Sequence, residues 1–163
     1  FKCFLSDKEL KSWKDFSKCK GAKGNYFLVK FEYDERFALN ENFEGTQISG
    51  HPVVIYLSID KNNIVQEINA YSDPNSPFYF RKQAHLLWLR VYVRYGSDGW
   101  NCIEKPKEQN HIAIGKQYIN RTCSKDLENK IINLETKFFF KDKKSRDNLV
   151  SKSFLQIKFS PST

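Results

Sequence analysis

The stretch RKQAHLLWLRVYVRYG, residues 81–96, decides the fold class that the sequence predicts. Its apolar side chains recur every three or four residues, which is the spacing of one face of an α-helix. The members of this apolar stripe are Phe80, Ala84, Leu87, Trp88, Val91 and Tyr95. We expect one long helix whose stripe packs on a β-sheet, with Trp88 buried at the contact.

The sequence also marks both ends of this helix. Ser76 is expected as the N-cap, and Pro77 as the first helical residue, where a missing N–H costs no hydrogen bond. Gly96 follows the last residue of the stripe and can end the helix in a left-handed conformation. The predicted helix therefore spans 77–95 without interruption.

Alternating apolar and polar residues predict the strands of the sheet. The runs VVIYLSI (53–59) and IVQEINAYS (64–72) flank a turn of Asp and Asn residues and predict a hairpin. The runs KIINLETKFFFK (130–141) and SFLQIKFS (153–160) flank a charged turn and predict a second hairpin. A further strand is expected at 26–33, a weak strand at 111–119, and loops at 34–52 and 103–110.

A second helix is expected at 7–17, because Ser6 and Glu9 form a capping box in front of an apolar stripe. The order of elements then predicts a single α+β domain, residues 1–163, in which two helices pack on an antiparallel β-sheet. A degenerate tandem αβββ arrangement is an alternative, since both halves run from a helix through a cysteine into strands.

Four cysteines occur in the chain, and their spacing does not match a zinc site. We expect two disulfides that close the shorter loops, Cys3 with Cys19 and Cys102 with Cys123. The even cysteine count, the start at Phe1 and the lack of Met lead us to expect a secreted or periplasmic protein whose signal peptide has been removed. Four reduced, buried cysteines in a cytosolic protein remain the alternative.

The search for catalytic patterns favours no enzyme. There are three histidines, His51, His85 and His111, and each has an ordinary structural explanation beside a strand, a helix or a loop. No nucleophile elbow, phosphate-binding glycine loop or helical histidine pair occurs. We therefore expect no catalytic residue, no metal and no cofactor. The triplet at 120–122 fits an N-glycosylation sequon, which by itself says nothing about function.

The leading functional hypothesis is therefore protein binding, as an inhibitor or immunity-type factor that blocks a partner protein. The formal net charge of +8 allows an acidic partner. Loops on a rigid scaffold commonly carry function, so 34–50 and 104–110 are the expected contact regions. The predicted anchors in or beside the first loop are Tyr33, Arg36, Phe37 and Phe43.

The alternative hypothesis is a basic module that binds an anionic polymer or surface, such as a glycan, nucleic acid or membrane. Its contact point would be the turn KDKKSR, which follows three phenylalanines. The cations of this turn are Lys141, Lys143, Lys144 and Arg146. Nucleic acid is the least favoured of these ligands if the compartment is oxidising.

Overall fold

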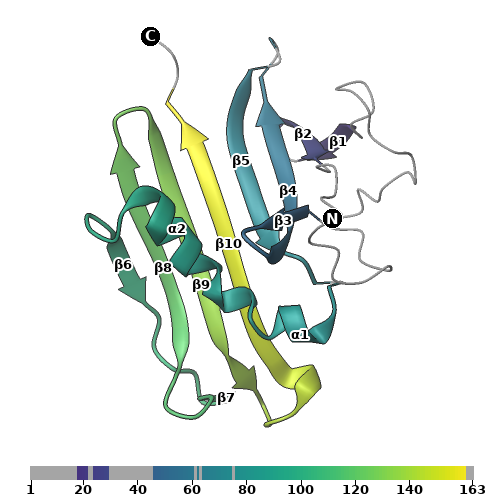
Figure 1. Ribbon diagram of the computed structural model, residues 1–163, viewed down its shortest axis with the longest axis vertical. Helices are drawn as coiled ribbons and strands as arrows, with labels where there is room; N and C mark the ends of the chain where they lie inside the picture. Colours follow the sequence, from purple (N-terminus) through teal and green to yellow (C-terminus); the bar gives the residue numbers. More distant parts are fainter. Residues whose placement is uncertain are drawn as a thin grey trace.

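The computed structural model describes residues 18–21, 24–29, 46–60, 62, 64–74 and 76–160, and for the first two ranges only the strand backbone. These residues form one antiparallel sheet with helices on a single face (Figure 1). The strand order is β1-β2-β4-β5-β10-β9-β8-β6, while β3 pairs with β4 and β7 pairs with β9. The predicted α+β class with an antiparallel sheet is confirmed.

The sheet and its helices have the following bounds. The strands of the first half are β1 (Lys18–Gly21), β2 (Gly24–Val29), β3 (Thr46–Ile48), β4 (His51–Ile59) and β5 (Val65–Ser72). The helices are α1 (Phe78–Arg81), the 3-10 helix η3 (Ala84–Leu86), α2 (Leu87–Tyr95) and a later 3-10 helix η4 (Arg146–Asn148). The strands of the second half are β6 (Asn101–Glu104), β7 (His111–Ile112), β8 (Ile119–Leu127), β9 (Lys130–Lys141) and β10 (Leu149–Phe159).

Both predicted hairpins are present. Strands β4 and β5 pair antiparallel, and the carboxylate of Asp60 closes their turn by accepting hydrogen bonds from the amides of Asn62 (2.8 Å) and Ile64 (2.9 Å). Strands β9 and β10 pair along their whole length. Strand β10 also pairs with β5, so the two hairpins join into one sheet.

The first strands agree with the sequence only in part. The strand predicted at 26–33 is confirmed as far as Val29, where β2 ends. Strand β2 pairs antiparallel with β1, with Gly21 opposite Gly24. The helix predicted at 7–17 lies outside the described residues, and so does the first helix of the alternative tandem arrangement.

The hydrophobic core lies between the helices and one face of the sheet. Alternating residues of four neighbouring strands point to this face, because side chains alternate along a strand. The buried members of the core are Val53, Ile55, Ala70, Leu87, Val91, Ile132, Leu134, Leu155 and Ile157. Trp88 packs against this cluster but is only half-buried, because it lies at the border of the helix stripe rather than at its centre.

The uninterrupted helix predicted for 77–95 is wrong: the segment breaks into α1, η3 and α2. In a continuous helix the amide of His85 would bond a carbonyl four residues earlier. Instead it donates to the Ser151 hydroxyl of β10 (3.1 Å), which itself donates to the carbonyl of Lys82 (3.0 Å). The Ser153 hydroxyl donates to the carbonyl of Ala84 (2.8 Å). Serines of the sheet thus replace helical hydrogen bonds at the break.

The predicted start of the helix also needs correction, whereas its end is close to expectation. Pro77 is the N-cap rather than the first helical residue. The buried Ser76 hydroxyl donates to the carbonyl of Asp73 (2.9 Å), so it does not cap the helix. Gly96 ends α2 with φ +84° and ψ 154°, a positive-φ conformation that glycine favours but that is not the predicted left-handed helical one.

Strands β1 and β6 and nearly all of β8 were missed, and the weak strand expected at 111–119 forms only β7 and the first residue of β8. Strand β6 occupies the start of the predicted loop at 103–110 and pairs with β8 at the edge of the sheet. Cys102 faces Cys123 in this pairing, and the two form a disulfide, which confirms the second predicted bridge. A disulfide-bonded pair fits a protein outside the cytoplasm. Cys3 lies outside the described residues, so its bridge to Cys19 and the removal of a signal peptide remain predictions. Of the helices described, none has the length and apolar character needed to span a bilayer.

Candidate functional site

The predicted protein-contact residues of the first loop, Tyr33, Arg36, Phe37 and Phe43, lie outside the described residues. The second expected contact region can be described: residues 105–110 follow β6 and are exposed. The basic turn between β9 and β10 can be described as well, and it is there that the structure brings charged and aromatic side chains together.

Hydrogen bonds within the basic turn fix its backbone. The side-chain amide of Asn148 donates to the carbonyl of Lys141 (2.6 Å), and the Ser145 hydroxyl donates to the Asn148 side-chain oxygen (2.7 Å). Asp142 adopts φ +67°, and its carboxylate accepts a hydrogen bond from the Asn110 side chain (3.0 Å). The cations of this turn therefore project from a loop whose backbone is held by hydrogen bonds.

The turn closes one side of a pocket of about 490 Å³ at the end of the helix-covered face. The opposite side is formed by α1 and the two residues that follow it. Most of the lining is apolar, with exposed cations among it. The lining residues are Phe78, Lys82, Gln83, Ile114, Phe138, Phe140, Lys144, Ser145, Arg146 and Leu149.

Strand alternation explains the apolar floor of this pocket. Phe138 and Phe140 are two residues apart in β9 and pair with Ser151 and Leu149 of β10. All four side chains point to the helix-covered face, because register partners share a face. Helix α2 lies over the middle of the sheet, and only α1 reaches the end at which the two phenylalanines lie (Figure 1). The pocket is the part of this face that the helices leave uncovered.

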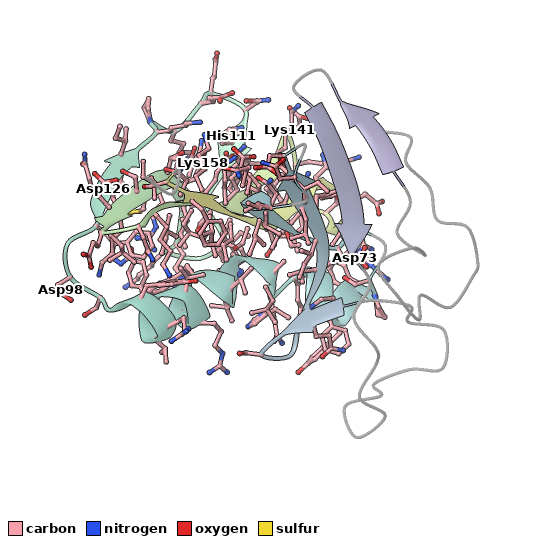
Figure 2. The ribbon with its side chains drawn as sticks, turned by 90° about the horizontal axis from the view of Figure 1, so that it is seen from above. Asp73, Asp98, His111, Asp126, Lys141 and Lys158 are labelled. Atoms are coloured by element: carbon pink, nitrogen blue, oxygen red, sulfur yellow. A yellow bond between two sulfur atoms is a disulfide. The ribbon has the colours of Figure 1, made fainter. Side chains whose placement is uncertain are left out.

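Only two of the four predicted cations line the pocket. Lys144 and Arg146 do so, whereas Lys143 is exposed and does not. Lys141 is the register partner of His111 and lies on the opposite face of the sheet, away from the helices (Figure 2). The cation that the sequence did not identify is Lys82, which follows α1 and is far from the turn in sequence.

Arg146 is held over an aromatic ring. Its guanidinium carbon lies 4.3 Å from the ring centroid of Phe78, and that of Arg81 lies 5.7 Å from the same centroid. Stacking of this kind uses the flat face of a guanidinium and leaves its N–H groups, which lie in the plane, free to donate. Phe78 thus orients Arg146 without consuming its hydrogen-bonding capacity.

No acidic side chain of the described residues lines the pocket. Among the described residues, no ion pair joins Lys82, Lys144 or Arg146 to a carboxylate. Two acids lie in or beside the turn: Asp142 is bound to Asn110, and Asp147, which follows Arg146, is exposed. The cations of the pocket are therefore available to an external anion.

A buried histidine supports the pocket floor. The ring of His85 stacks on Phe138 with centroids 3.7 Å apart, and its Nδ1 lies 3.1 Å from the Ser151 hydroxyl. Burial lowers the pKa of His85, a backbone hydrogen bond to Lys82 opposes this, and the charge of His51 lowers it further. His85 is therefore neutral at pH 7 and adds no charge to the site.

The other two histidines contact aromatic or charged neighbours. His111 stacks on Phe139 and lies 3.0 Å from the hydroxyl of Tyr118 and 3.6 Å from the carboxylate of Glu108. Burial, and then the charge of Arg90, lower the pKa of His51. No group of three metal-ligating side chains occurs among the described residues.

The N-glycosylation triplet lies in a buried position. Asn120 is in β8 with only 4% of its surface exposed, and its side-chain amide lies 3.5 Å from the hydroxyl of Tyr118. A glycan on Asn120 would have to displace the packing of this side chain.

Comparison with protein-family models, with curated proteins and with solved structures finds no match to this chain. The functional proposal therefore rests on the residues and charges of the pocket.

The sequence signal for the site was incomplete. The three consecutive phenylalanines next to the basic turn were recognised, but strand alternation assigned Phe138 and Phe140 to the core face and Phe139 to the opposite face. In the structure Phe139 is buried on the opposite face, whereas Phe138 and Phe140 are only half-buried. No sequence signal links α1 to this turn, because their contact depends on the break in the helix.

Proposed function

We propose that this protein binds an amphiphilic anion, a ligand with an apolar body and one anionic group, in the pocket between α1 and the β9–β10 turn. The observation that carries this proposal is the placement of Lys82, Lys144 and Arg146 around an apolar pocket of about 490 Å³, which has no acidic residue in the described part of its lining. The volume falls in the range typical of small-molecule sites.

The two parts of the lining support the two parts of the ligand. Phe138, Phe140 and Leu149 offer apolar surface that would be removed from water by an alkyl or aromatic body. Lys144 and Arg146 can form charge-assisted hydrogen bonds with a carboxylate or phosphate group. This proposal refines the alternative hypothesis of an anion-binding module and replaces a polymer by a single amphiphile, because the site is concave.

Protein binding through Tyr33, Arg36, Phe37 and Phe43 remains a separate prediction, as does the role of an inhibitor or immunity-type factor. The pocket is favoured here because its residues, their charges and their contacts can be described.

Titration calorimetry with dodecanoate, and with dodecanol as the neutral ligand of equal chain length, tests the proposal. The variant Lys144→Gln/Arg146→Gln should bind dodecanoate between about tenfold and a hundredfold more weakly, since each lost charge-assisted bond is worth on the order of 1.5 kcal/mol and neighbouring losses add incompletely. Its affinity for dodecanol should not change. Phe138→Ala should weaken both ligands.

The matched control is Lys152→Gln/Lys158→Gln, which removes two exposed cations of β10 that do not line the pocket. It should bind dodecanoate like the wild type. Equal affinity of the wild type and the Lys144/Arg146 variant for dodecanoate would overturn the proposal. Steeply salt-dependent binding of heparin or a single-stranded oligonucleotide, without dodecanoate binding, would favour an anionic polymer instead.

A further inference from the structure

A second cluster of unused polar groups lies beneath the start of α2. Four buried side-chain polar atoms of the described residues have no hydrogen-bond partner in the structure. Three of them belong to residues that neighbour one another: Nε1 of Trp88, Nε of Arg121 and Oγ1 of Thr136. None of these three residues lines the pocket described above.

Sheet register brings the three side chains together. Arg121 of β8 and Thr136 of β9 are register partners, so they are neighbours on the helix-covered face. The guanidinium carbon of Arg121 lies 5.0 Å from the ring centroid of Trp88, which belongs to α2. The cluster is therefore enclosed between the helix and two strands.

The unpaired atoms are costly to bury. Thr136 has no exposed surface, and a buried hydroxyl without a hydrogen bond is strongly disfavoured. Nε of Arg121 and Nε1 of Trp88 can only donate, and the Thr136 hydroxyl can also donate. Three neighbouring groups that can donate and have no partner favour an acceptor from outside the chain.

The charge of Arg121 is poorly balanced. Its side chain is 21% exposed, and its carboxylate partner, Glu104 of the edge strand β6, is 63% exposed and lies 3.9 Å from NH1. That long ion pair involves one terminal nitrogen and leaves Nε unbonded. A half-buried cation with unfilled donors favours an anionic acceptor over a neutral one.

We propose that Trp88, Arg121 and Thr136 form a binding site for a carboxylate group. One carboxylate oxygen accepts from Nε of Arg121, and the pair of oxygens has enough lone pairs to accept from the indole and the hydroxyl as well. The site borders solvent beside β6, where the exposed Glu104 competes for the same guanidinium. This inference does not depend on the pocket ligand and uses different residues.

Formate is the probe, because it is the smallest carboxylate. The melting temperature of the wild type should rise with formate and saturate as a single site does, beyond the response to equal concentrations of chloride.

Arg121→Gln should abolish this saturating rise of the melting temperature. Trp88→Phe keeps an aromatic ring, and Thr136→Val keeps the side-chain shape; each should raise the apparent dissociation constant of formate about tenfold by removing one donor to a charged group. Glu104→Gln should lower that constant, since it removes the competing carboxylate.

Trp100→Phe is the matched control, because it also removes an indole N–H, one that donates to the carbonyl of Gly96 (2.8 Å). It should lower the melting temperature but keep the formate response. The same formate response in the wild type and Arg121→Gln would overturn the proposal and leave water as the acceptor for the three donors. Equal stabilisation by chloride would overturn the assignment of a carboxylate.

Discussion

The ring of His85 is enclosed between the sheet and the helical segment that crosses it. It stacks on Phe138, and its backbone amide is bound by Ser151. Burial is the largest cause of its lowered pKa, because the charged imidazolium would lose hydration that this environment does not replace. His51, whose pKa burial also lowers, acts in the same direction. His51 and His85 thus make the free energy of unfolding depend on pH.

Stability should therefore fall as the pH is lowered below about 6.5. In that range the unfolded chain binds protons at His51 and His85, whereas the folded chain binds them only once the pH reaches their lowered pKa values. The free energy of unfolding is thus larger at about pH 7.5 than at about pH 5.5, and urea denaturation at both values measures the difference.

The variant His85→Leu should flatten this pH dependence, because it removes one of the two titrating groups. The Ser151 hydroxyl keeps its bonds to the backbone of residues 82 and 85 in this variant. A slope between pH 7.5 and 5.5 as steep as in the wild type would show that His85 does not contribute.

At the scale of elements, the sheet determines where the helical segment breaks. Periodicity identified the apolar stripe correctly, but it carries no information about hydrogen bonds made to a distant strand. Ser151 and Ser153 lie in β10, well over sixty residues from the backbone groups that they bind. Local propensity therefore predicted one helix where tertiary contacts give three short ones. The break also places Lys82 beside the pocket. The hydrogen bonds to β10 therefore explain why the sequence predicted neither the break nor Lys82 as a pocket residue.

Ser151→Ala tests this explanation of the break. The substitution leaves the amide of His85 and the carbonyl of Lys82 without their partner, and two buried backbone groups left unpaired should lower the free energy of unfolding by about 2–3 kcal/mol. Lys152→Ala is the control, because its side chain is exposed on the other face of the same strand and should change stability by less than about 0.5 kcal/mol. Urea denaturation measures both. Similar values for the two variants would show that water replaces the serine at the break.

At the scale of the whole molecule, the sequence predicted the pairing within hairpins but not between them. Alternation and turn residues identified β4–β5 and β9–β10, because those contacts are local. The pairing of β5 with β10 joins segments with long intervening chain, and the pairing of β6 with β8 joins segments that neither alternation nor a tight turn marks. The Cys102–Cys123 bridge was predictable because it closes a short loop. It joins β6 to β8, a strand pair that the alternation of apolar residues did not predict. The pocket depends on both the break and the long-range pairing, which is why the sequence named only Lys144 and Arg146 among the cations that line it.

The β5–β10 pairing leads to a prediction about the unfolding of the chain. The core combines Val53 and Ile55 of the first hairpin with Leu87, Ile132 and Leu155 of the second half, so neither half buries its apolar face alone. Val53→Ala, a truncation in the first hairpin, should lower the free energy of unfolding by about 1–3 kcal/mol. The loss should be equal whether it is measured by amide exchange in β4 and β5 or by exchange in β8 and β9, because the sheet unfolds as one cooperative unit. Exchange at both places under conditions that report global unfolding checks this, with Lys152→Ala as the variant that should shift neither. A loss confined to β4 and β5 would divide residues 46–160 into two independent units and contradict the single domain that the sequence predicts.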